Sequence, residues 1–279
     1  EGAEAPAADD RLRGSGCVLE ASEPPSLKGN NFTKAALWSP DGTTVLVAHD
    51  DSKMRLYQVP PAALEGSETA PAQIQPYAEV EDGGPLKDFC FFPGFSADCP
   101  ASCCFLSSSQ DHPIHLRDAF TGELRNSYRP YNQVDEVCHA FSLAFSPDGA
   151  AIVAGFDSVI RVFDVQRPGR QVEEWNLSTR KGKGQKGIIG AVAGSPTSPG
   201  LYAAGSYNRS VCLYQHGGRK HSLVAWLQDT EQDYAMGGVT QLGWCGEWLL
   251  LSGHRKDQWL RAWDIRMAGG DQNREARDL

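Results

Sequence analysis

The sequence of 279 residues predicts an all-β fold, a propeller of four-stranded blades. Three observations predict this fold. One seven-residue pattern recurs five times, an apolar segment precedes each copy, and no stretch of ten residues spaces its apolar side chains as a helix does. Repeats of this kind indicate supersecondary units that stack on one another to bury a shared core.

The pattern itself predicts a strand that starts from a tight turn. Each copy begins with Asp or Asn, has apolar residues at positions four and six, and ends in an aromatic residue in four of five cases. Alternation with a period of two is typical of a strand, and an Asp or Asn side chain can hydrogen-bond its own backbone in a turn. The copies are DSKMRLY, DHPIHLR, DSVIRVF, NRSVCLY and DQWLRAW, which makes the predicted turn residues Asp51, Asp111, Asp157, Asn208 and Asp257.

Two further strands are predicted ahead of each copy. The nearer strand ends in small residues, and three of these strands follow an SPDG or SPTSPG turn, with another apolar strand before it. The nearer strands are VLVAH, CFLSSS, AIVAG, LYAAGS and LLLSG. The five turn residues are 46 to 60 residues apart, which leaves room for a fourth strand in every unit. Since FDV at Phe163 and WDI at Trp263 end their strands as WD repeats do, we predict a WD40-type β-propeller with about five blades in this chain.

The domain boundaries follow from the repeats. We expect residues 30–266 to form the propeller and residues 1–29, with six acids against three bases, to be a disordered acidic tail. Residues 267–279 are interpreted as a C-terminal tail or the start of a linker to further blades. Five blades leave sheet edges unpaired in an open ring, so we expect this propeller to be incomplete relative to a larger ring. A self-closing ring of five blades is the alternative.

Charge is distributed unevenly along the chain. The net charge is −9, which argues against bulk attraction to nucleic acid, yet the stretch from Arg161 to Lys186 carries a local charge of +4. That stretch contains Gly182, Gly184 and Gly187 in the spacing G-x-G-x-x-G. The β-branched and small residues that follow predict a strand, and a nucleotide phosphate needs a helix N-terminus there. We therefore expect a basic loop between two blades, either a solvated connection or a phosphate contact for RNA.

The candidate RNA-binding residues are the cations of these basic loops and turns. Aromatic residues that could stack on bases, Trp175, Tyr207 and Trp259, lie near them in the sequence. The strand arginines Arg55, Arg161 and Arg261 share one repeat position, which favours pairing with an acid of a neighbouring blade over binding. The full set of candidates is Arg161, Arg170, Arg180, Lys181, Lys183, Lys186, Arg209, Arg255 and Lys256.

No motif in the sequence predicts catalysis. The patterns G-x-S-x-G and H-E-x-x-H are absent, and the one cysteine cluster, Cys99, Cys103 and Cys104, has the wrong spacing for zinc and is expected to be buried strand thiols. We predict no enzyme, no metal, no cofactor and no small-molecule substrate. No apolar run is long enough to span a membrane, so we expect a soluble intracellular protein.

Several loops are more specific than a generic WD repeat. They include HPIHLRDAFTGELRNSYRPYN, RPGR, GQKGII, LYAAGSYNRSVCLY and SGHRKD, in this order between about Asn30 and Arg266. In these stretches the chain resembles the telomerase Cajal body protein family. Arg117 departs from the family pattern, which has tryptophan at this position.

The resemblance implies a non-enzymatic RNA-binding scaffold. The expected RNAs are H/ACA-type small Cajal body RNAs and telomerase RNA, which the family directs to Cajal bodies in the nucleus. The expected protein partners are telomerase and the H/ACA core proteins, with a cytosolic chaperonin for folding in the cytoplasm. A protein-only assembly platform that binds no RNA is the alternative, since WD propellers are most commonly used in that way.

Overall fold

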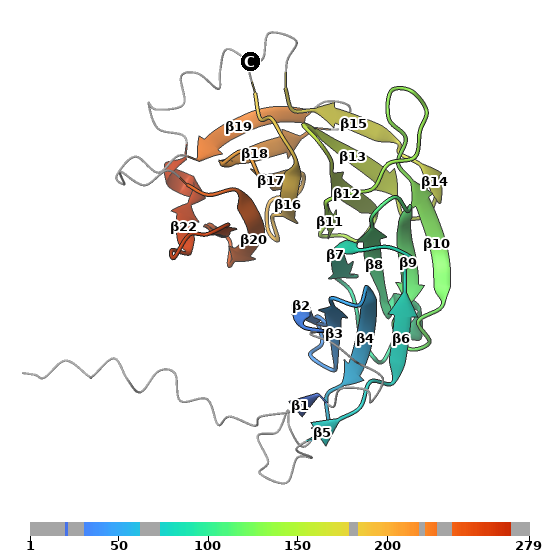
Figure 1. Ribbon diagram of the computed structural model, residues 1–279. Helices are drawn as coiled ribbons and strands as arrows, with labels where there is room; N and C mark the ends of the chain where they lie inside the picture. Colours follow the sequence, from blue (N-terminus) through green and yellow to red (C-terminus); the bar gives the residue numbers. More distant parts are fainter. Residues whose placement is uncertain are drawn as a thin grey trace, which may run out of the picture.

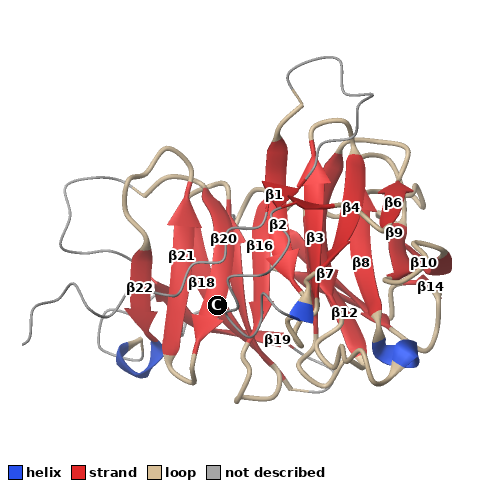
Figure 2. Ribbon diagram, turned by 90° about the horizontal axis from the view of Figure 1, so that it is seen from below, coloured by secondary structure: helices blue, strands red, loops and turns tan. Residues whose placement is uncertain are grey.

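Five small antiparallel sheets stand side by side in an arc around a centre (Figure 1). The sheets form a β-propeller arrangement, as the repeats predict. The structure is a computed structural model, and it describes residues 20–21, 31–61, 73–178, 184–217, 221–227 and 236–268. Figure 2 shows the strands of neighbouring blades running alongside one another across the molecule.

Within each blade the strands lie side by side in chain order, from the innermost strand outward. Blade 1 consists of β2 (Thr33–Trp38), β3 (Thr44–His49), β4 (Lys53–Gln58) and β6 (Ala78–Glu81). Blade 2 consists of β7 (Leu86–Phe91), β8 (Cys104–Ser109), β9 (Ile114–Asp118) and β10 (Leu124–Arg129). Blade 3 consists of β11 (Ser142–Phe145), β12 (Ala151–Gly155), β13 (Val159–Asp164) and β15 (Glu173–Asn176). Blade 4 consists of β16 (Ile189–Gly194), β17 (Leu201–Ser206), β18 (Ser210–His216) and β19 (His221–Leu227).

Three strands of blade 5 lie within the described residues, where the repeats leave room for four. These strands are β20 (Val239–Cys245), β21 (Leu249–His254) and β22 (Arg261–Asp264). Short elements flank the blades: β14 (Gly169–Arg170) pairs in parallel with β10, β1 (Glu20–Ala21) pairs in parallel with β5 (Gln73–Ile74), and two 3-10 helices are η1 (Pro100–Ser102) and η2 (Ile265–Met267).

The recurring pattern forms the third strand of every blade, as predicted. A single residue with positive φ sits in the turn ahead of each of these strands, which is uncommon for a residue with a side chain. These five residues are Ser52, Asp111, Ser158, Arg209 and Lys256. Every one of these tight turns therefore contains a left-handed residue, directly before the strand in blades 1, 3 and 4 and a few residues earlier in blades 2 and 5.

The predicted turn residues do not all act in the same way. Asp51 and Asp257 accept a hydrogen bond from the backbone N–H two residues on, at 3.1 Å in both cases. The Asp157 carboxylate accepts a hydrogen bond from the Ser158 hydroxyl, and the Asp111 backbone N–H donates to His139 Nδ1. The turn's own Asp side chain thus holds the first and the last turns, whereas the Asn208 N–H of the fourth turn donates to the Ser206 hydroxyl at 3.0 Å.

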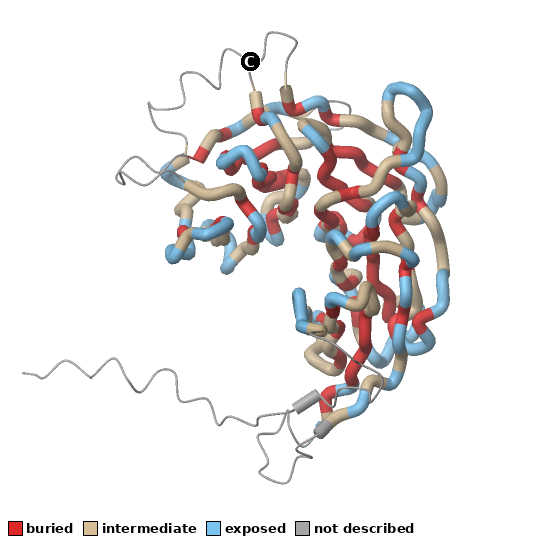
Figure 3. Tube along the Cα trace, in the orientation of Figure 1, coloured by how far each residue is buried: buried red, intermediate tan, exposed pale blue. Residues whose placement is uncertain are grey.

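The hydrophobic core is divided among the spaces between neighbouring blades. Met54 and Leu56 of blade 1 pack with Phe105 of blade 2, and the same arrangement repeats between each following pair up to blades 4 and 5. The buried segments lie along the facing strands of neighbouring blades (Figure 3). Strand β2 is the exception among the innermost strands, since five of its six residues are exposed. The blade-to-blade packing therefore runs along the arc from blade 1 to blade 5.

The strand arginines are structural, and the ion pairs described for them lie within their own blades, where an acid of a neighbouring blade was expected. Arg55 binds Asp51 and Glu79, Arg161 Nε lies 3.1 Å from a Glu174 oxygen, and Arg261 pairs with Asp257. The acids lie in the preceding turn or on the next strand of the same sheet. Antiparallel pairing brings Glu79 and Glu174 of the next strand within reach of the Arg55 and Arg161 guanidinium groups.

Arg117 fills the position where the other four repeats have an aromatic residue. Its Nε donates to Asp82 Oδ1 at 3.0 Å, and the Asp82 side chain is only 1% exposed. Asp82 lies in the connection between blades 1 and 2, and it also contacts His115 Nδ1 at 3.1 Å. An ion pair to the buried Asp82 carboxylate thus occupies the position at which the other four repeats have an aromatic residue.

Several predictions fall partly outside the described residues. Of the tail 1–29, only β1 is described, and it is a paired strand; of residues 267–279, only Met267 and Ala268 are described. Cys103 and Cys104 are buried as expected, whereas Cys99 is exposed. In the described ranges, no helix is long and apolar enough to cross a membrane.

Candidate functional site

The turns between the second and third strands share one face of the propeller with the connections between blades, because strand direction alternates within each sheet. We call this face the connection face. Hydrogen bonds tie its parts together: the Tyr207 N–H donates to the Ile188 carbonyl and the Arg255 N–H to the Gly238 carbonyl, at 2.9 and 2.7 Å. Turns and connections of adjacent blades therefore form one continuous surface.

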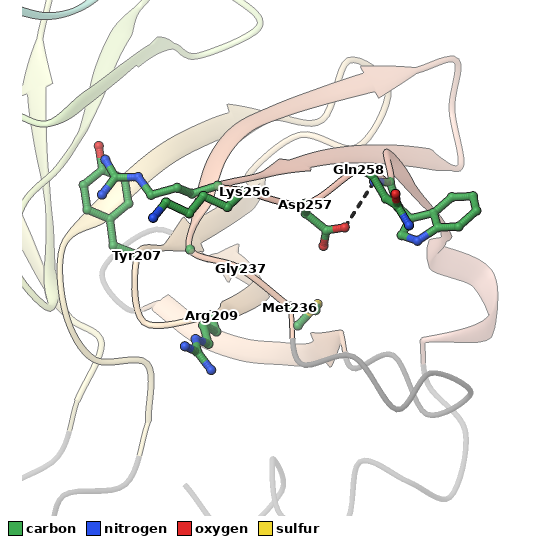
Figure 4. A pocket seen from close by; sticks show the side chains of 10 residues that line it. Tyr207, Arg209, Met236, Gly237, Lys256, Asp257 and Gln258 are labelled. Carbon is green, nitrogen blue, oxygen red and sulfur yellow. Dashed lines mark hydrogen bonds between the residues drawn. The ribbon is translucent and has the colours of Figure 1, made fainter.

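A pocket of about 710 Å³ lies on the connection face between blades 4 and 5. The β17–β18 turn, the connection to β20 and the β21–β22 turn contribute its walls (Figure 4). We call it the basic pocket; it is lined by Tyr207, Arg209, Met236, Gly237, Gly238, Arg255, Lys256, Asp257, Gln258 and Trp259.

Two consecutive glycines make the walls of the basic pocket fit together. A Cβ on Gly237 would lie 2.2 Å from the Arg255 carbonyl oxygen, and a Cβ on Gly238 would lie 2.7 Å from the Tyr207 carbonyl oxygen. Only glycine allows a backbone to approach this closely. The glycine pair therefore holds the turns of two blades against one short segment.

Cations and aromatic rings line the basic pocket together. Arg209, Arg255 and Lys256 are exposed, and the Arg255 guanidinium lies 5.3 Å from the centre of the Tyr207 ring. Such a cation–π contact orients the guanidinium while leaving its edge donors free. Trp259 is 53% exposed. The pocket thus offers charge for phosphate and flat rings for bases.

One carboxylate lies among these cations. Asp257 accepts a hydrogen bond from the Trp259 N–H at 3.1 Å and pairs with Arg261, which lies outside the pocket lining. The hydrogen bond from Arg261 lowers the pKa of the Asp257 carboxyl. Its charge is matched by Arg261, so Arg209, Arg255 and Lys256 supply the net charge among the described residues that line the pocket.

The basic loop predicted from the glycine spacing leads into β16, a strand and not a helix, as expected. Arg180, Lys181 and Lys183 lie outside the described residues, whereas Lys186 is described and exposed. The Ser206 hydroxyl donates to the Lys186 carbonyl at 2.6 Å, one residue before Tyr207 of the basic pocket. The described end of this loop therefore adjoins the turn that carries Arg209.

Gln185 anchors that loop end. Its side chain is fully buried, and its amide nitrogen donates to the Ala204 carbonyl at 2.9 Å and to the Ser210 carbonyl at 3.1 Å. The Tyr214 hydroxyl donates to the Gln185 amide oxygen at 3.1 Å. The loop is thereby fixed to blade 4, the blade that supplies one wall of the basic pocket.

Two further candidates lie elsewhere. Arg161 is 5% exposed, bound to Glu174 and stacked 4.4 Å from the centre of the Phe156 ring. Arg170 is exposed on β14, at the outer edge of blade 2, where Asp135 accepts from it at 2.7 Å. Neither residue lines the basic pocket. Among the aromatic candidates, Trp175 is buried between blades 3 and 4, where it stacks on His216 and His221.

Sequence reasoning missed the residues that shape the basic pocket. The missed residues carry no charge, which is why a search for cations did not find them. They are Met236, Gly237, Gly238 and Gln258. The Gly-Gly pair just before an apolar strand is a signal that could have indicated close backbone approach. Among the described residues, no cluster of three or more His, Cys, Asp or Glu side chains could hold a metal ion.

A family model described as "WD domain, G-beta repeat" matches residues 133–164, which include the first three strands of blade 3. Telomerase Cajal body protein 1 of Homo sapiens is 40% identical over 247 residues, which cover 88% of this chain and 43% of that protein. The Bos taurus protein of the same name is 41% identical over 246 residues, covering 86% and 43%. Telomerase Cajal body protein 1 homolog of Drosophila melanogaster is 33% identical over 253 residues, covering 86% and 44%.

The chain thus spans less than half the length of these relatives. Within that span the identity extends over most of the chain, and blade 3 of the five blades matches the WD-repeat model. Over the region that matches, the chain therefore belongs to the telomerase Cajal body protein family of WD-repeat propellers.

Proposed function

We propose that this chain is a non-enzymatic WD-repeat scaffold that binds single-stranded RNA through the basic pocket. The observation that carries the proposal is the meeting of Arg209, Arg255 and Lys256 with Tyr207 and Trp259 in one pocket. Unpaired bases are bound by stacking on aromatic side chains while cations hold the phosphates. A pocket that offers both suits an RNA loop better than a smooth duplex.

The names of the relatives support a role beside telomerase and in Cajal bodies. We infer that the RNAs are H/ACA-type small Cajal body RNAs and telomerase RNA, and that the particles contain telomerase and the H/ACA core proteins. We place the bound protein in the nucleus, at Cajal bodies, with folding by a chaperonin in the cytoplasm. Arg180, Lys181, Lys183 and Lys186 would extend the phosphate-binding surface beyond the pocket.

Salt-dependent binding tests the proposal directly. A labelled single-stranded RNA that carries an H/ACA terminal loop is titrated with the full chain at several salt concentrations. Arg209→Asn and Lys256→Asn remove charge but keep a residue that tolerates positive φ at these turns. Each variant should lower the slope of log affinity against log salt by about 0.7, the value for one lost phosphate contact on a single strand.

The matched control is Arg167→Asn, an exposed cation in the turn between β13 and β15, away from the basic pocket. Its affinity and salt slope should stay at the wild-type values. Equal losses in the control and the pocket variants would place RNA binding elsewhere on the chain.

A protein-only assembly platform is the second candidate, and the net charge of −9 favours it. Ultraviolet crosslinking of the endogenous protein separates the two functions. Enrichment of H/ACA-type RNAs supports the scaffold for RNA, whereas protein complexes that survive ribonuclease without any crosslinked RNA support the platform.

A further inference from the structure

His254 ends β21 immediately before Arg255 of the basic pocket. Its side chain is 7% exposed and does not line the pocket. It lies between the interior of blade 5 and the glycine segment that forms one pocket wall. Its contacts in both directions indicate a role in holding that wall.

Three hydrogen bonds run in sequence through His254. The Trp263 indole N–H donates to the Ser252 hydroxyl at 2.8 Å, Ser252 Oγ lies 2.8 Å from His254 Nε2, and His254 Nδ1 lies 3.1 Å from the Gly237 carbonyl oxygen. A carbonyl oxygen can only accept, so Nδ1 carries the proton. In the neutral ring Nε2 then accepts from the Ser252 hydroxyl, and every polar atom in the chain of bonds has a partner.

The environment of His254 favours this neutral form. Burial lowers the pKa of the imidazole, and the charge of Arg261 on β22 lowers it further. The hydrogen bond to the Gly237 carbonyl and the Asp257 carboxylate raise this pKa, but they do not outweigh burial and Arg261. At neutral pH the ring therefore keeps one donor, and that donor faces Gly237.

The position of Gly237 decides the geometry of the basic pocket. Gly237 and Gly238 lie against the carbonyl groups of Arg255 and Tyr207, with no room even for a methyl group. The Arg255 N–H is also bonded to the Gly238 carbonyl. A small shift of the glycine segment would therefore move Arg255 away from the Tyr207 ring.

We propose that His254 is a positioning residue of the basic pocket: it links the Trp263–Ser252 pair of blade 5 to the Gly237 carbonyl and so fixes the distance between the Arg255 and Tyr207 turns. The RNA-binding part of this inference rests on the proposed function. The positioning part concerns the protein alone and has its own measurement.

Three variants test the inference in the full chain. His254→Leu removes both bonds, while His254→Asn keeps a side-chain N–H near the position of Nδ1 and should restore the bond to Gly237. Ser252→Ala breaks the same chain of bonds one step earlier, and it decides the question if His254→Leu does not fold. Thermal unfolding is followed for all three.

Two measurements are made on each variant. Hydrogen exchange of the Arg255 amide reports how firmly the glycine segment is held, and anisotropy with a fluorescein-labelled single-stranded RNA oligonucleotide reports binding. We expect His254→Leu to speed exchange and weaken RNA affinity about fivefold, as one lost hydrogen bond implies, and His254→Asn to recover most of both.

The outcomes separate the two claims. Unchanged exchange of the Arg255 amide in His254→Leu and in Ser252→Ala overturns the positioning role. The positioning role is also overturned if Arg255 amide exchange rises as much in His254→Asn as in His254→Leu, since the restored donor would then have no effect. If the wild-type chain binds no RNA while exchange changes as expected, the proposed function fails and the positioning role of His254 stands.

Discussion

The buried pair of Asp82 and Arg117 gives the sharpest prediction about stability. Burial by itself raises the pKa of Asp82, but the hydrogen bond from His115 and the charge of Arg117 outweigh it and lower the pKa to about 2. The reference value for an aspartate is 3.8. The difference corresponds to about 2 kcal/mol of folding free energy, because one pKa unit is worth about 1.4 kcal/mol.

The sign of the pH dependence follows from the depressed pKa. The unfolded chain binds the proton first, so this stabilisation is complete above the unfolded value near 4. It is lost as the pH falls from there through about 2. Asp82→Asn removes the ionisable group. The unfolding free energy of the wild type should therefore fall by about 2 kcal/mol more than that of Asp82→Asn between pH 5 and pH 2.

Arg117→Met tests the partner at constant pH. It leaves the Asp82 carboxylate buried without its arginine, in contact with His115 and Ser107, and breaking a buried pair in this way costs about 3 kcal/mol. Urea unfolding followed by tryptophan fluorescence at pH 7 measures the loss. The double variant Asp82→Asn/Arg117→Met should be at least about 1 kcal/mol more stable than the sum of the single losses predicts.

Two results would refute this reasoning. The first is an Arg117→Met protein within about 0.5 kcal/mol of the wild type, the usual range for a surface change. The second is an Asp82→Asn protein with the same acid sensitivity as the wild type. Either result would mean that the pair of Asp82 and Arg117 does not stabilise the folded chain.

Three further predictions concern a glycine of the pocket wall, the anchor of the basic loop and a buried carboxyl group in blade 2. Gly238→Ala should lower the unfolding free energy by about 1–3 kcal/mol, because its Cβ would lie 2.7 Å from the Tyr207 carbonyl, whereas Gly243→Ala, with no atom within 4 Å, should change it by less than about 0.5 kcal/mol; chemical denaturation compares the two. Gln185→Leu removes the donors to two carbonyl groups of blade 4 and should cost about 2–4 kcal/mol in the same assay, and a smaller loss than about 1 kcal/mol would contradict the anchoring role. Burial raises the pKa of Asp88 to about 7, so the unfolded chain ionises first and stability should fall as the pH rises from about 4 to 7; Asp88→Asn should lack this fall when unfolding is measured across that range.

The local sequence predicts much of this fold because the strands and turns of each blade depend on residues that are close together in the chain. The third strand of every blade begins at or within a few residues of its Asp or Asn, since alternation and turn-forming side chains act over only a few positions. The replacement of an aromatic residue by Arg117 was visible in the sequence as well. Its partner Asp82 was not, because 35 residues separate the two positions.

The pairing of the strand arginines shows a second limit. The shared repeat position of Arg55, Arg161 and Arg261 predicts a common structural role, which the structure confirms. The choice between an acid of the same blade and one of the next depends on strand register and side-chain reach. Neither property is fixed by the repeat alone.

The sequence by itself determined that the chain forms WD-repeat blades, which residues turn between strands, and that its cations gather in loops. Only the tertiary structure decided which cations act together. Arg209 and Arg255 meet because adjacent blades place their equivalent turns side by side, with Gly237 and Gly238 between them. Arg161 was also a candidate from the sequence, but its strand position buries it. An unpaired charge would be costly there, and Glu174 neutralises it.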